Sequence, residues 1–166
     1  MVYDVDINRE QMSALFDIKG PRNDVKNLLS SMFEKLPQDP NTLVYKKNKT
    51  LMFIGFEHWI LRAAADEETV LRSKLDPELV PSNVSVVLIS DSLVFFSIKG
   101  KNAKDIMKIA SPLDFDFSIF KENYVTFSEV FGIRALIKRR DDGFEFGVDQ
   151  SFGNMISDYL ARTIKD

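Results

Sequence analysis

Few residues of this chain combine the type and the spacing that catalysis needs. Its one histidine, His58, stands between Glu57 and Trp59. An imidazole beside a carboxylate could act as a general base. The surrounding residues are predicted to form a strand, however, and neighbours on a strand point to opposite faces, so Glu57 and His58 would not pair. We therefore expect no catalytic role for His58, and we expect Trp59 to be a core or interface anchor.

Asp114 and Asp116 form the second candidate pair. In an extended segment both carboxylates would point to one side, as in an acid–base pair or a hard-cation site. No further residue with ligand spacing accompanies them. A turn after a helix predicted at 102–110, with solvated or capping aspartates, is the preferred interpretation.

Two charged clusters and two glycine turns complete the search. Lys46-Lys47-Asn48-Lys49 and Arg139-Arg140-Asp141-Asp142 indicate solvated turns, and the first is too short to indicate nucleic-acid binding, although it could touch an acidic partner. Gly20-Pro21 and Gly100-Lys101 match neither the dinucleotide fingerprint nor a P-loop, so both are predicted to be turn glycines. We expect no catalytic, cofactor-binding or metal-ligating residue in this chain.

Composition narrows the classes of function further. The 166 residues include no cysteine and carry a net charge of −3. Thiolate metal sites, disulfides and cysteine nucleophiles are excluded, and a nucleic-acid partner is disfavoured. No apolar run approaches the roughly 20 residues of a membrane helix, and Met1–Arg9 shows no signal-peptide pattern. We expect a cytoplasmic protein with a single domain, 1–166.

Apolar periodicity predicts four helices, at about 22–36, 67–75, 102–110 and 151–164. The last has the clearest stripe of apolar residues at helical spacing, namely Phe152, Met155, Ile156, Tyr159 and Leu160. Pro37 is predicted to end the first helix, because proline cannot continue the hydrogen-bond ladder.

Strands are predicted between these helices, at about 13–19, 42–47, 51–56 and 58–63, with hairpins at 83–99 and 131–149. The first hairpin would turn at Ser90-Asp91-Ser92 and the second at Asp142-Gly143, a pair that tolerates positive φ. Strands that alternate with helices and include hairpins predict an α+β fold, with helices packed on a mainly antiparallel sheet.

One short repeat suggests a duplication. Phe16-Asp17-Ile18-Lys19-Gly20 and Phe96-Ser97-Ile98-Lys99-Gly100 each lead from a predicted strand into a predicted helix. Two halves of about 80 residues, each with a strand–helix–hairpin core, would form a duplicated ferredoxin-like unit. A chance echo of five residues is the alternative.

Core and turn residues also carry a family resemblance. They are Phe96 to Gly100, Ala103, Ile106-Met107, Ser111 to Asp114, the strand Phe144 to Val148 followed by Gln150-Ser151-Phe152 and the stretch to Leu160, and upstream Gly55 with Trp59-Ile60-Leu61. This pattern resembles the gamma subunit family of heterotetrameric sarcosine oxidase, best over about 50–165. The strand–Gly–helix pattern of both halves is also similar to the aminomethyltransferase (glycine-cleavage T-protein) superfamily. Lys101 is a departure, since the family often has Gly-Pro at this turn.

The resemblance implies a function as well as a fold. The fold would be that of the N-terminal part of T-protein. The chain would be a non-catalytic accessory subunit of a complex that oxidatively demethylates sarcosine to glycine, with peroxide and a one-carbon unit transferred to tetrahydrofolate. FAD, FMN, NAD and tetrahydrofolate would belong to larger flavoprotein and folate-domain subunits, the expected partners.

Two alternatives stay open. One is a free-standing, folate-binding protein of the T-protein type, and the other is a small homodimeric module with an unrelated ligand. For an accessory subunit, Phe115, Phe117 and Phe120 are the first candidates for an apolar partner surface.

Overall fold

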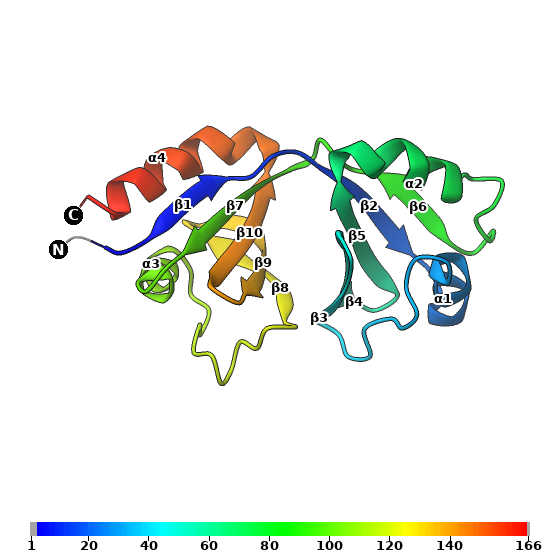
Figure 1. Cartoon of the computed structure of the whole chain (residues 1–166), viewed down its shortest axis with the longest axis horizontal. Helices are drawn as coiled ribbons and strands as arrows, with labels where there is room; N and C mark the ends of the chain where they lie inside the picture. The colour runs from blue at the N-terminus through cyan, green and yellow to red at the C-terminus, as the bar shows by residue number, and fades with distance from the viewer. Residues whose placement is uncertain (1–2, 166) are drawn as a thin grey trace. The chain divides into compact units, whose positions relative to one another are not determined.

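A computed structural model describes residues 3–165 of the chain. These residues divide into two compact units (Figure 1). Unit 1 combines Met1–Gln11 with Asp91–Asp166, and unit 2 is Met12–Ser90. The expectation that the whole chain is a single domain stays a prediction.

Unit 2 is a five-stranded antiparallel sheet with two helices. In chain order it contains β2 (Ser13–Lys19), α1 (Arg22–Leu29), β3 (Thr42–Lys46), β4 (Lys49–Gly55), β5 (His58–Ala64), a short 3-10 turn (Ala65–Glu67), α2 (Glu68–Lys74) and β6 (Ser85–Leu88). The strand order is β3-β4-β5-β2-β6. Both helices pack on one face of the sheet, because the same buried cluster includes Phe16, Ile18, Val25, Leu29, Trp59, Leu61 and Leu71.

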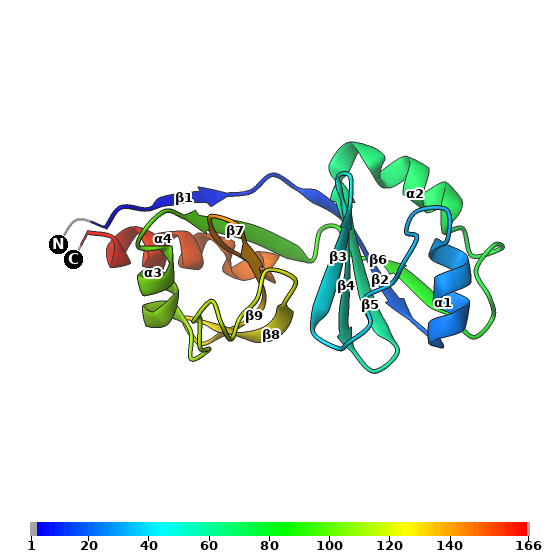
Figure 2. The same cartoon turned by 60° about the horizontal axis from the view of Figure 1, so that its bottom comes forward.

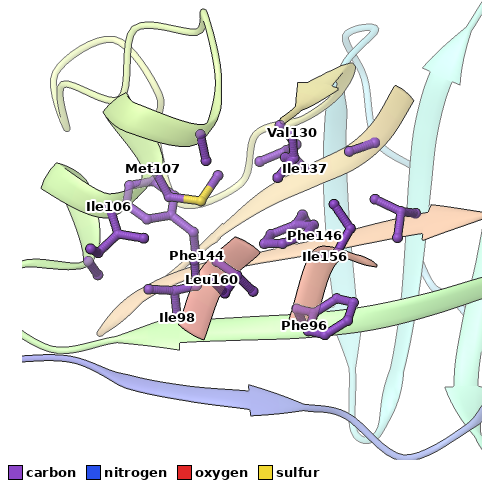
Figure 3. Packing of buried hydrophobic residues seen from close by; sticks show 14 of the residues in the cluster. Phe96, Ile98, Ile106, Met107, Val130, Ile137, Phe144, Phe146, Ile156 and Leu160 are labelled. Carbon is purple, nitrogen blue, oxygen red and sulfur yellow. The ribbon is translucent and has the colours of Figure 1, made fainter. Parts of the chain in front are cut away.

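Unit 1 repeats this architecture. It contains β1 (Asp6–Arg9), β7 (Leu93–Lys99), α3 (Ala103–Ala110), β8 (Val125–Val130), β9 (Ile133–Arg140), β10 (Gly143–Asp149), a 3-10 turn (Gln150–Phe152) and α4 (Gly153–Thr163), with the strand order β1-β7-β10-β9-β8. Side chains of α3 and α4 meet those of β7 and β10 in the core (Figure 3), which includes Phe96, Ile98, Ile106, Met107, Phe144, Phe146, Ile156 and Leu160.

The two units share their register as well as their element order. Ile18 lies opposite Trp59 in unit 2, as Ile98 lies opposite Phe144 in unit 1. The α+β prediction with two ferredoxin-like halves is therefore confirmed. The first strand of each sequence half completes the sheet of the other unit, since β1 pairs with β7 and β6 pairs with β2. This crossing can be followed in Figure 2.

The predicted hairpin at 83–99 is therefore wrong. Its two strands, β6 and β7, exist but belong to different sheets, and the segment around Asp91 carries the chain from one unit into the other. The hairpin at 131–149 is confirmed, since β9 pairs with β10 from Arg140 and Gly143 onward. Strands β1 and β8 are additional to the predicted ones.

The first helix is shorter than predicted. It ends at Leu29. The N–H and the hydroxyl of Ser30, the next residue, both donate to the carbonyl oxygen of Asn27. Met32, Phe33 and Leu36 are nevertheless buried. Their apolar character reflects packing in irregular chain after the helix, so Pro37 does not terminate it.

Both predicted turn glycines occupy backbone conformations that favour glycine. Gly20 has φ 153° and Gly100 has φ 108°. A Cβ atom on Gly20 would lie 2.9 Å from the carbonyl oxygen of Asn83, and one on Gly100 would lie 2.6 Å from that of Asp4. Asn83 and Asp4 precede the equivalent edge strands β6 and β1, so each glycine allows an edge strand to approach its helix turn closely.

Candidate functional site

The polar cluster around His58 is the arrangement in unit 2 that comes nearest to a chemical site. His58 begins β5 and Asp17 lies on the adjacent strand β2, where the register brings the two side chains together. Nε2 of His58 forms a hydrogen bond with Oδ1 of Asp17, and Nζ of Lys19 lies 3.4 Å from Oδ2 of the same carboxylate. The His58 side chain is 30% exposed and that of Asp17 is 19% exposed, so the pair is accessible from solvent.

Two of these residues, Lys19 and His58, line a shallow groove of about 510 Å³. Its other lining residues come from the turn after β2, the β4–β5 turn and the start of β6 with the segment before it, namely Gly20, Phe56, Glu57, Ser82, Asn83, Val84 and Ser85. The turn is held in place because the N–H of Gly20 donates to the carbonyl oxygen of Glu57 at 3.0 Å, with Glu57 at φ 48°. Phe56 at its tip is 90% exposed.

The chemistry available in this groove is limited. A carboxylate on one imidazole nitrogen orients the ring and leaves the other nitrogen to accept or donate a proton. Lys19 adds a positive charge that suits an anionic or polar group. No group of three His, Cys, Asp or Glu side chains within residues 3–165 could hold a metal ion. His58 and Lys19 can therefore bind a small anionic or polar group in this groove.

The sequence-based search missed the partner of His58. Glu57 is the adjacent residue, whereas Asp17 lies 41 positions earlier in the chain. Only the pairing of β2 with β5 brings the two together. Trp59, the other residue singled out here, is a core residue, fully buried and stacked on Phe53 with ring centroids 5.0 Å apart.

Asp114 and Asp116 cap turns, as predicted. Oδ1 of Asp114 accepts from the N–H of Asp116 at 2.9 Å, and Oδ1 of Asp116 accepts from the N–H and hydroxyl of Ser118 at 2.9 and 2.7 Å. Lys104 Nζ lies 3.0 Å from Oδ2 of Asp116. The hydrogen bonds from Ser118, with the charge of Lys104, hold the pKa of Asp116 below its usual value.

The first charged turn is largely neutralised by acidic residues of unit 2. Lys46 pairs with Glu34, and Lys49 pairs with Glu67, which also accepts from the side-chain amide of Asn48. The hydrogen bond from Lys46 lowers the pKa of Glu34. These internal pairs reduce the positive charge that the turn could offer to an acidic partner.

The second charged turn differs from the prediction of solvated side chains. Nη1 of Arg139 donates to the carbonyl oxygens of Phe117 and Phe120 at 3.2 and 3.3 Å, and its guanidinium lies 3.9 Å from the centre of the Phe117 ring. Arg140 Nη1 lies 3.0 Å from Oε2 of the buried Glu145. Both arginines therefore fix neighbouring structure in unit 1.

The predicted apolar partner surface on the 112–123 stretch is wrong for two of its three residues. Phe115 and Phe120 are buried and form edge-to-face contacts with each other, while Phe144 packs against both. Phe117 alone is substantially exposed, at 47%. This stretch has no regular periodicity, so its sequence does not indicate that Phe115 and Phe120 are part of the core of unit 1.

Similar solved structures share the duplicated ferredoxin-like α+β fold of this chain. A chain of heterotetrameric sarcosine oxidase from Corynebacterium sp. U-96, solved with pyrrole 2-carboxylate, matches with a TM-score of 0.86 and 16% identity, over 97% of this chain and 84% of that one. The glycine cleavage system aminomethyltransferase T from Bartonella henselae matches with a TM-score of 0.68 and 14% identity. The match covers 95% of this chain but 45% of the transferase.

A third similar structure is the ligand-free regulatory subunit of aspartate kinase from Thermus thermophilus, with a TM-score of 0.52 and 13% identity over 98% of this chain and 99% of that chain. No protein-family model and no curated protein matches the sequence. At these identities the structural matches establish the fold, which by itself does not define an activity. In the described part of the chain, no helix is long and apolar enough to cross a membrane.

Proposed function

We propose that this chain is a non-catalytic accessory subunit of a cytoplasmic oxidoreductase complex of the sarcosine oxidase type. The observation that carries the proposal is the match over 97% of the chain, at a TM-score of 0.86, to a chain of a heterotetrameric sarcosine oxidase. In this proposal the larger partner subunits hold FAD, FMN, NAD and tetrahydrofolate, and they carry out the oxidative demethylation.

The surface of unit 2 supports a docking role. Several large apolar side chains are at least about half exposed there, namely Met12, Phe56, Val70, Leu79 and Val87. Single exposed apolar residues are ordinary, but an aromatic ring at the tip of a fixed turn is the kind of anchor that protein interfaces bury. The ring of Phe56 contributes to a groove wall and little to the core, so association is the role that suits it.

Co-expression with any flavoprotein chains that neighbouring genes encode tests the proposal. The expected result is a stable complex on size exclusion with light scattering, weakened by Phe56→Ser. Ile119→Ser, which also removes an exposed apolar side chain but from unit 1, is the matched control. If the wild-type chain stays apart from every co-expressed flavoprotein chain, the proposal is wrong.

A second candidate is a free-standing folate-binding protein of the T-protein type. The match to aminomethyltransferase T and the accessible His58–Asp17 pair favour it. Calorimetric titration with tetrahydrofolate separates the two candidates. Saturable binding by the isolated chain, lost in Asp17→Asn and His58→Gln, would favour the folate binder, whereas the accessory subunit is expected to give no heat of binding.

A further inference from the structure

The two units end in equivalent edge strands of opposite character. Strand β6 lies at one edge of the unit 2 sheet, and β1 lies at the corresponding edge of the unit 1 sheet. The segment around β1 carries charges at Asp4, Asp6, Arg9 and Glu10. The segment from Pro81 to Ser90 around β6 carries none. Proteins commonly protect open edges with charges, so an uncharged edge rich in β-branched residues is an exception that invites pairing.

The exposed side of β6 presents unpaired backbone groups in a defined pattern. The N–H of Ile89 donates to the carbonyl oxygen of Leu15 at 2.8 Å, directly after the rung that joins Leu88 to Phe16. Backbone groups alternate in direction along an antiparallel strand. Those of Val87 therefore face β2, and those of Val86 and Leu88 point away from the sheet. A strand added here would bond to Val86 and Leu88.

The space beside the edge also differs between the units. A groove of about 450 Å³ separates α2 from β6. Phe16, Leu75, Val86 and Leu88 form its apolar lining, and Thr69, Arg72, Ser73 and Asp76 also line it. The equivalent groove between α4 and β1 is about 200 Å³. There Arg9 occupies the position equivalent to Leu88, and its Nη1 donates to the side chain of Asn154 on α4 at 3.0 Å. The arginine bridges strand and helix in unit 1, whereas the groove in unit 2 is left open.

We propose that β6 accepts an extended, uncharged segment of the larger partner subunit, which adds as a sixth strand to the unit 2 sheet. The inference rests on the proposed function and specifies how the subunit is attached. Main-chain bonds to Val86 and Leu88 supply the pairing, and apolar side chains of the segment enter the groove beside α2. An uncharged segment is expected along the strand edge, because β6 and its flanks from Pro81 to Ser90 offer no charged side chain to pair with a charge placed there.

Hydrogen–deuterium exchange on the full chain, free and in complex with its co-expressed flavoprotein partner, tests this attachment. The amides of Val86 and Leu88 are expected to become protected in the complex. The outward-facing amides of Ile7 and Arg9 on β1 provide the internal control, and they are expected to exchange equally in both samples.

A variant pair supplies a second measurement. Leu88→Pro removes one outward N–H without touching the ladder to β2 and is expected to weaken association about tenfold, since one net hydrogen bond is worth about that factor. Leu88→Thr also loses the leucine side chain but keeps the N–H, so it is expected to bind about tenfold more tightly than Leu88→Pro. Hence the two variants separate the backbone bond from the lost leucine: a proline that binds as well as the threonine would overturn the inference.

The exchange measurement needs no variant, so it decides even if Leu88→Pro does not fold. A complex in which Val86 and Leu88 exchange as freely as in the isolated chain overturns the inference and leaves the accessory role intact. If protection of the Val86 and Leu88 amides in the isolated chain rises with its concentration, the added strand comes from a second copy of this chain. That result also overturns the inference. Failure to form any complex refutes the proposed function, and this inference with it.

Discussion

Lys138 and Glu145 face each other across β9 and β10, with Nζ of the lysine 3.2 Å from Oε1 of the glutamate. Their side chains are 10% and 3% exposed. Charges taken out of water in this way are stable as a pair, but one left alone is costly. The second carboxylate oxygen of Glu145 lies 3.0 Å from Nη1 of Arg140, so one buried carboxylate joins two cations.

Removing one partner is expected to be far worse than removing both. Glu145→Leu removes the buried carboxylate that both Lys138 and Arg140 contact and is expected to lower the free energy of unfolding by about 3–5 kcal/mol. The double variant Lys138→Met with Glu145→Leu should recover most of that loss. Urea denaturation measures both, and a double variant no more stable than Glu145→Leu would contradict the expectation.

Gly100→Ala is expected to destabilise the chain by more than about 1 kcal/mol, because φ 108° disfavours a side chain and the new Cβ would lie 2.6 Å from the Asp4 carbonyl oxygen. Gly55→Ala is the matched control, since no atom lies within 4 Å of its added Cβ. We expect Gly55→Ala to change the stability by less than about 1 kcal/mol. Equal thermal shifts for the two variants would show that β1 does not approach the turn as described.

Asp116 gives a pH dependence with a definite sign. Its pKa in the folded chain is lower than the ordinary value of 3.8. The ionised group therefore contributes stability above the ordinary pKa, and this contribution is lost as the pH falls through the folded value. Asp116→Asn should lower the Tm at neutral pH, and the gap to wild type should narrow below pH 3.8. Thermal melts across pH measure the gap, and a gap that does not change with pH would refute the assignment.

The crossing of the chain between the units leads us to expect one cooperative unfolding transition. Strand β1 belongs to unit 1 and runs directly into β2 of unit 2, while β6 of unit 2 runs into β7. Unfolding of one unit would therefore free the chain segment to which the edge strand of the other unit is directly connected. Trp59, the one tryptophan, is buried in unit 2. Its fluorescence and far-UV circular dichroism should give coincident urea transitions, and separate midpoints would show two independent domains.

The sequence allowed good prediction wherever local patterning decides the structure. Alternation in Ile133 to Val148 and the Asp142-Gly143 turn predicted the β9–β10 hairpin, and the apolar stripe near the C-terminus predicted α4. Strand β1 could not be predicted, because Ile7 is its one apolar residue and Asp6, Asn8 and Arg9 are polar or charged. A strand with so weak a pattern owes its pairing to β7, which lies almost 90 residues away.

Long-range pairing explains the other misses. Adjacent strands usually pair, so β6 and β7 suggested a hairpin, yet each joins a different sheet. The same limit applies to the His58–Asp17 contact, which exists because β2 lies beside β5. The burial of Phe115 and Phe120 depends on Phe144, which follows them by more than 20 residues. No periodicity within the segment reports such a contact.

The exchange of edge strands means that the repeat in the sequence and the unit in space are cut at different places. A fragment of about the first 80 residues would hold β2 to β5 but lack β6, and its own β1 would have no β7 to pair with. Two copies of such a half could satisfy each other by trading first strands, as in a domain-swapped homodimer. Joined end to end, that dimer would have the connectivity of this chain.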